Sequence, residues 1–113
     1  MAKLAARAQL MGDAPVAAVA VLEPLVHLLD DEGQRLLAAA LARAERPWDA
    51  VRVYRALIVA APDDATVWMG LALALDATGT DRTAVVYAYQ QARALSHDAR
   101  LSRLAELRLA ALA

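Results

Sequence analysis

Few side chains in this sequence are of the types that usually carry out chemistry. Its 113 residues include two histidines and no cysteine, which excludes disulfides and thiolate metal sites. His27 and His97 lie far apart in the chain, and neither stands in a metal-ligand spacing such as His-Glu-x-x-His. We therefore expect no metal site and no cofactor.

The run Ser96-His97-Asp98 contains the residue types of a hydrolytic triad, but adjacent side chains diverge and cannot pass a proton along the run. We instead expect Ser96 or Asp98 to cap the following helix by accepting free backbone N–H groups of its first turn. Gly70 and Gly79 are isolated, with no phosphate-binding loop around them. The sequence therefore predicts a protein that is not an enzyme.

The charge balance bears on the class of partner. The chain has 12 basic and 13 acidic residues, whereas nucleic-acid binding usually requires a basic excess. We expect no nucleic-acid partner. The acidic pairs Asp30-Asp31 and Asp63-Asp64 fall where helices are expected to begin, so we interpret them as caps that also offset the helix dipole.

Composition favours helices over sheets. Apolar residues make up 60% of the chain and aromatic residues only 4%, and a core of alanine and leucine suits closely packed helices. The length predicts one domain. Even the run from Gly12 to Leu29 is interrupted by acidic residues and prolines, so we expect no direct membrane insertion.

Helix-breaking and capping residues divide the chain into seven segments of about ten to sixteen residues. In each segment apolar residues recur at helical spacing, and none alternates with period two. Pro15 and Pro47 stand where a first-turn proline costs nothing. Pro24 lies inside the second segment, where we expect a kink or a split. Asp81 or Thr80 is expected to cap the sixth helix.

The stretch from Asp31 to Asp64 is 34 residues long and resembles the tetratricopeptide repeat (TPR). Ala38 and Ala50 match the family's small positions and Pro62 the end of its second helix. Its aromatic position corresponds to Tyr54, which the resemblance places in the gap toward the next hairpin.

The neighbouring segments resemble the same repeat less closely. The next unit has Ala72 at a small position of the repeat. Tyr89 matches its aromatic position only if the turn between the two helices holds one extra residue. The first unit matches the repeat pattern less well. Three of the five tryptophans and tyrosines match bulky family positions, so we expect these aromatic rings in the core. The resemblance implies an all-α, right-handed superhelix of about three antiparallel helix hairpins. As a single domain, 1–113, it would comprise hairpins at about 2–30, 31–64 and 65–97 and a capping helix at 98–113.

In this family the first helices of successive hairpins line a concave groove that holds a polypeptide. Carried over by position, the resemblance implies groove residues Arg7, Leu10, Met11, Arg35, Ala39, Ala42, Arg43, Met69, Leu73 and Asp76. Small and apolar residues flanked by arginine suit an amphipathic or extended apolar segment with some acidic character. Charge reversal of Arg35 and Arg43 is expected to weaken partner binding and to leave stability nearly unchanged.

Two groups within the family give more specific expectations. The length and the run of hairpins resemble the small cytoplasmic TPR chaperones of bacterial type III secretion. The stretches Val67–Leu75, Ala88–Leu95 and Arg108–Leu112 resemble C-terminal repeats of pilus-biogenesis proteins of the mannose-sensitive type IV class, which would place the chain in a membrane-associated assembly platform. Both imply a non-catalytic chaperone or scaffold.

A third interpretation is a structural protein that associates with its own copies, for example as a homodimer. The last segment has more leucines than one apolar stripe requires: Leu101, Leu104, Leu107, Leu109 and Leu112.

Overall fold

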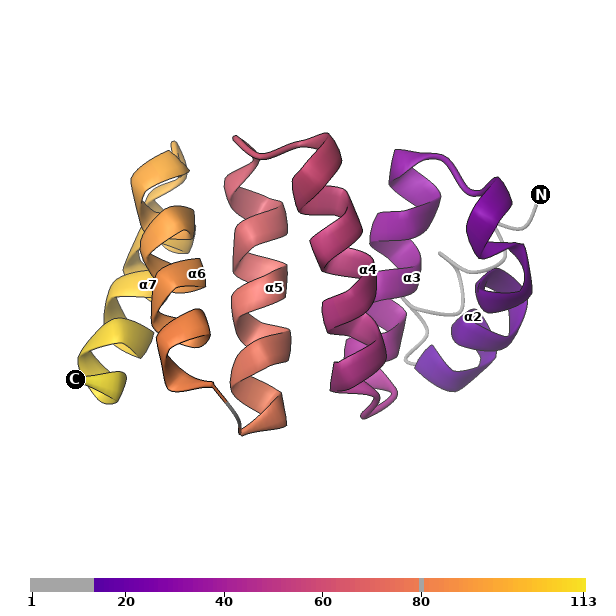
Figure 1. Cartoon of the computed structure of the whole chain (residues 1–113), viewed down its shortest axis with the longest axis horizontal. Helices are drawn as coiled ribbons and strands as arrows, with labels where there is room; N and C mark the ends of the chain where they lie inside the picture. Colours follow the sequence, from indigo (N-terminus) through magenta and orange to yellow (C-terminus); the bar gives the residue numbers. More distant parts are fainter. Residues whose placement is uncertain (1–13, 80) are drawn as a thin grey trace.

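The computed structural model describes residues 14–79 and 81–113, and within them the chain is all-α, with no strand. The elements are α2 (Pro15–Leu22), the 3-10 helix η1 (Glu23–Leu28), α3 (Asp31–Arg43), α4 (Pro47–Ala60), α5 (Ala65–Thr78), α6 (Arg82–Leu95) and α7 (Ala99–Leu112). Figure 1 shows them side by side in chain order, along the longest dimension of 41 Å. No described helix is long and apolar enough to cross a membrane.

Aspartate caps begin four of the helices. The carboxylates of Asp30, Asp64, Asp81 and Asp98 accept backbone N–H groups in the first turns of α3, α5, α6 and α7. These N–H groups have no partner within their own helix, so a side-chain acceptor stabilises the helix start. The caps expected from Asp81 and Asp98 are confirmed, and of the two acidic pairs the capping residues are Asp30 and Asp64.

Prolines set the other helix starts and one break. Pro15 and Pro47 occupy the first turn of α2 and α4, as predicted. Pro24 cannot donate an N–H to the preceding turn. Accordingly α2 ends at Leu22 and the chain continues as the tighter helix η1, which confirms the expected split.

The helices pack in two layers. Each α-helix from α2 to α6 packs on the one that follows it, and α5 also contacts α3 and α7. Within the described residues α2, α4 and α6 do not contact one another. One layer therefore contains α3, α5 and α7, in which α5 contacts both of the others, and the other layer contains α2, α4 and α6, which do not contact one another among the described residues.

Alanine and leucine make up most of the core. Ala38 and Ala50 are fully buried, which allows neighbouring backbones to approach closely, and Tyr89 is the largest fully buried side chain. Two other aromatic rings contradict the expectation of a core position. Trp48 and Tyr87 are 58% and 53% exposed, so the described helices enclose neither ring, although one edge of Tyr87 meets Trp68 of α5.

Candidate binding surface

The structure places the predicted groove residues in different environments. Arg7, Leu10 and Met11 lie outside the described residues. The others belong to α3 and α5: Arg35, Ala39, Ala42, Arg43, Met69, Leu73 and Asp76.

Arg35 is engaged within the chain. Its guanidinium contacts the carboxylate of Asp64 at 2.7 Å and that of Asp31 at 2.8 Å. The hydrogen bond to Asp64 and the charges of both carboxylates raise the pKa of Arg35 despite partial burial. Charge reversal at Arg35 should therefore reduce stability, contrary to the expectation from the sequence. A carboxylate at this position would lie beside the carboxylates of Asp31 and Asp64 and be repelled by them.

The partner of Arg35 also caps a helix. Burial alone would raise the pKa of Asp64, but the hydrogen bond from Arg35 and those from the N–H groups of Thr66 and Val67 outweigh it and leave the pKa lowered. Arg35 and Asp64 thus join the first turn of α3 to the start of α5.

Met69 and Asp76 are also used within the fold. Met69 is 6% exposed and belongs to the core. The Asp76 carboxylate accepts the Tyr89 hydroxyl at 3.0 Å and the Arg108 Nε at 3.1 Å, with a second contact to the Arg108 guanidinium. Burial raises the pKa of Tyr89 to about 12, with the nearby Asp76 carboxylate adding to the shift. This cluster ties α5, α6 and α7 together.

The remaining predicted groove residues include exposed side chains. Ala42 and Arg43 are exposed on α3, Ala39 is half-buried, and Leu73 is 45% exposed on α5.

A nearby helix extends this surface. Leu104 and Leu107, three residues apart on one face of α7, are 41% and 57% exposed. The contact between Arg108 and Asp76 brings this part of α7 against α5, one turn beyond Leu73. We call Leu73, Leu104 and Leu107 the α5–α7 apolar surface. The sequence had marked the two α7 leucines as surplus but had not assigned them to a groove.

Positive charge flanks this surface. Arg100 and Arg103 precede Leu104 and Leu107 on α7, and both are exposed. Neither forms an ion pair with another described residue. These guanidinium groups are therefore available to a partner with negative charge.

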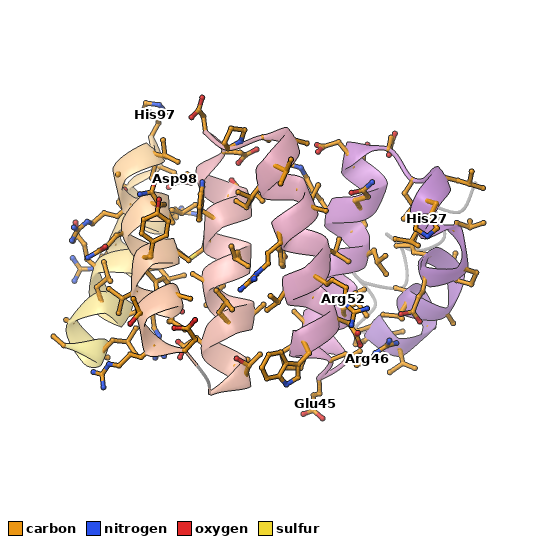
Figure 2. The ribbon with its side chains drawn as sticks, in the orientation of Figure 1. His27, Glu45, Arg46, Arg52, His97 and Asp98 are labelled. Atoms are coloured by element: carbon orange, nitrogen blue, oxygen red, sulfur yellow. The ribbon has the colours of Figure 1, made fainter. Side chains whose placement is uncertain are left out.

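The structure does not bring the two histidines together. Figure 2 shows His27 and His97 at opposite ends of the molecule. The Ser96 hydroxyl donates to the backbone carbonyl of Asp98 at 2.8 Å, while the Asp98 carboxylate accepts the N–H of Arg100. Ser96 and Asp98 thus serve the turn and the cap of α7.

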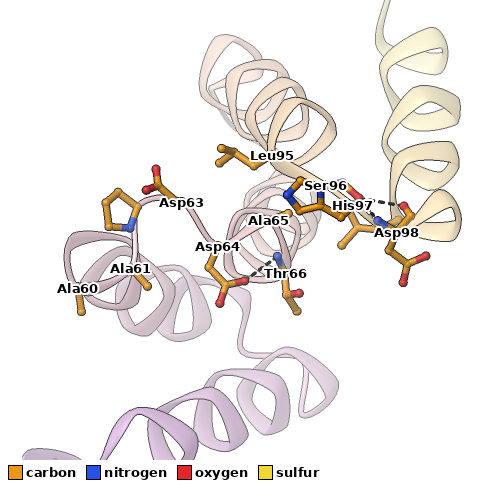
Figure 3. A pocket seen from close by; sticks show the side chains of 12 residues that line it. Ala60, Ala61, Asp63, Asp64, Ala65, Thr66, Leu95, Ser96, His97 and Asp98 are labelled. Atoms are coloured by element: carbon orange, nitrogen blue, oxygen red, sulfur yellow. Dashed lines mark hydrogen bonds between the residues drawn. The ribbon is translucent and has the colours of Figure 1, made fainter.

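An open hollow of about 750 Å³ lies at the end of the helices, lined by the α4–α5 and α6–α7 turns (Figure 3). Within residues 14–79 and 81–113, no group of three or more histidine or acidic side chains could hold a metal ion. Two of the acidic residues that line this hollow, Asp64 and Asp98, act as helix caps.

Comparison with known proteins found no matching family model, no similar curated protein and no similar solved structure.

Proposed function

We propose that this chain is a non-catalytic protein-interaction module that holds a partner polypeptide on the face formed by α3, α5 and α7. The observation that carries the proposal is the α5–α7 apolar surface beside Arg100 and Arg103, which form no ion pair among the described residues. Exposed leucines gathered on one face reduce solubility, and such patches in soluble proteins mark sites of interaction. Arg100 and Arg103 favour a partner segment that is amphipathic or extended, apolar, and partly acidic.

Features of the packing support a TPR-like superhelix for this module. The layer of α3, α5 and α7 is in continuous contact while the layer of α2, α4 and α6 is spread apart, as in a stack that curves toward the first layer. Ala38 and Ala50 are fully buried, and Tyr54 packs against Gly70 of α5. These contacts agree with the roles that the repeat resemblance gives to the small and aromatic positions.

The cellular setting is proposed from the resemblance alone. A chaperone of bacterial type III secretion in the cytoplasm is the first assignment, and a pilus-biogenesis platform at the membrane is the second. In both settings the proposed activity is to bind another polypeptide.

Self-association through α7 is a second candidate, because Leu104 and Leu107 lie on the last helix. In a two-fold dimer the same patch faces itself. Arg100 and Arg103 would then approach their own copies, and like charges across an interface are unfavourable. The charge pattern therefore favours a different, acidic partner.

The proposal is tested by affinity capture from a bacterium that encodes the chain, using the tagged wild type and the L104S/L107S variant. The matched control is Val16→Ser, since Val16 is 71% exposed on α2, away from α7. We expect the wild type and the control to recover the same partner proteins and the α7 variant to lose them, with similar thermal unfolding by circular dichroism. Equal recovery by all three would contradict the proposed surface. A wild type whose sedimentation coefficient falls on dilution and that recovers only its own copies would favour self-association.

A further inference from the structure

A second surface lies on the opposite layer of the stack. Both α4 and α6 pack on α5, but the described residues of α4 and α6 do not contact each other. A stretch of α5 thus stands between them, as Figure 1 shows. At this place the structure has a hollow of about 350 Å³. Its lining, which we call the α4–α6 groove, is Trp48, Val51, Arg52, Arg55, Leu75 and Asp81.

The apolar part of the groove is centred on Trp48. This indole is 58% exposed, whereas Val51 and Leu75 behind it are almost fully buried. Tryptophan provides a large apolar area at little cost in conformational entropy and is enriched among the residues that dominate binding energy at interfaces. Trp48 is therefore suited to cover an apolar side chain placed in the hollow.

The charged part of the groove has an unused cation. Arg55 is exposed and forms no ion pair among the described residues. Arg52 contacts Asp49 at 3.1 Å, and the Asp81 carboxylate accepts the N–H of Ala84 as the cap of α6. The nearby carboxylates are thus engaged, and the Arg55 guanidinium is available to a carboxylate from outside.

A second aromatic site lies along the same groove. Trp68 is two helical turns before Leu75 and shares its face of α5, about 10 Å along the helix. Its ring meets Tyr87 of α6 edge to face, with ring centroids 5.7 Å apart. The Trp68 indole donates to the carbonyl of Pro62 at 2.7 Å, which fixes its orientation. Tyr87 is half exposed, so this aromatic pair offers a further apolar contact along α5, beyond the residues that line the hollow.

We propose that the α4–α6 groove binds an extended acidic peptide segment, independently of the α5–α7 apolar surface. Trp48 and Arg55 are separated by about 10 Å along α4, and an extended chain covers that distance in about three residues. The segment therefore carries an apolar side chain for Trp48 and, three residues away, a carboxylate for Arg55. The chain's net charge of −1 favours a peptide over a nucleic acid.

The test is an NMR titration of the ¹⁵N-labelled full chain with short synthetic peptides. Each peptide has a Leu-Ser-Ser-Glu or Phe-Ser-Ser-Glu core between Gly-Ser flanks, in both chain directions. Control peptides have glutamine in place of glutamate. We expect saturable shifts of the Trp48 indole N–H and of amides in α4 and α6. Loss of the carboxylate should weaken binding at least about tenfold, because a charge-assisted hydrogen bond is lost.

Variants of the chain assign the contact. Arg55→Glu and Trp48→Ala should each abolish saturation by the glutamate peptides. Arg93→Glu is the matched control, because it reverses an exposed arginine of α6 that forms no ion pair among the described residues and does not line the hollow, and it should leave the affinity unchanged. Any of four results would overturn the proposal. The shifts could be confined to α3 and α7, or no peptide could give a saturable shift. The glutamate and glutamine peptides could bind with equal affinity, or a single-stranded oligothymidylate could bind more tightly than the peptides.

Discussion

The side chain of Asp76 shows how the fold uses its enclosed polar groups. Its carboxylate accepts both the hydroxyl of buried Tyr89 and the guanidinium of Arg108. A hydroxyl buried without a partner would cost free energy, so this carboxylate stabilises the junction of three helices. Among the described residues no charged side chain is fully buried.

Gly70 gives a prediction at the scale of single residues. A Cβ at this position would lie 2.4 Å from the ring of Tyr54. Gly70→Ala should therefore destabilise the protein by about 1–3 kcal/mol through overpacking, offset by up to about 1 kcal/mol from the better helix propensity of alanine. Urea denaturation measures the net loss.

The contribution of Tyr54 to this loss of stability can be measured by making the Gly70→Ala substitution in a Tyr54→Leu variant as well. In Tyr54→Leu the ring is absent, so adding Gly70→Ala should cost less than it does in the wild type. The difference is the interaction energy of a double-mutant cycle. An equal cost in both backgrounds would show that the ring is not what limits the space at Gly70.

Residue environments could be predicted from the sequence only in part. The repeat spacing correctly placed Ala38, Ala50 and Tyr89 in the core. The general expectation that all five aromatic rings lie in the core was wrong for Trp48 and Tyr87, because helical periodicity tells which face of a helix a residue occupies but not whether another helix covers that face. The engagement of Arg35 by Asp64 also could not be predicted, since it depends on how α3 and α5 meet.

At the scale of elements, the sequence predicted helix starts and breaks well because their causes are local. An aspartate cap or a first-turn proline acts within one turn of its own position, and the break at Pro24 follows from a missing N–H. Contacts between helices depend on the whole packing. The separation of α4 from α6, on which the α4–α6 groove rests, therefore had no signal in the sequence.

The start of α5 gives a prediction at this scale. Asp64 both caps α5 and pairs with Arg35. Asp64→Asn keeps a capping acceptor but loses the ion pair, and should destabilise by about 0.2–1 kcal/mol. Asp64→Ala also loses the cap, which should add about 1 kcal/mol. Urea denaturation of both variants at neutral pH separates the two contributions.

The contribution of the ion pair should depend on pH. The pKa of Asp64 is lowered below 3.8 in the folded protein. The stability it contributes is therefore fully present above the pKa of the unfolded chain, near 3.9, and is lost as pH falls through the folded pKa. The gap between the wild type and Asp64→Asn should close in that acidic range. Asp63→Asn is the neighbouring control, and a gap that persists in acid would rule out the charge as its cause.

At the scale of the whole molecule, the order of packing follows the order of the chain. Each helix contacts only its neighbours in the stack, and α7 contacts only α5 and α6 among the described elements. In such a linear arrangement stability is close to a sum of local terms, and an end can open without the rest. The α5–α7 apolar surface includes this end, so the proposed partner would bind at an end of the stack.

The contact between Arg108 and Asp76 should therefore control the docking of α7 more than the stability of the whole stack. In Arg108→Ala, amides of α7 should exchange with deuterium about tenfold faster, because the ion pair that holds the helix to α5 is lost. Amides of α3 and α4 should keep their wild-type rates, and Arg103→Ala, which removes an unpaired arginine of the same helix, should change neither set. A uniform rise across α3 to α7 would instead show that the chain opens as one cooperative unit, and the partner would then have to bind a fully formed stack.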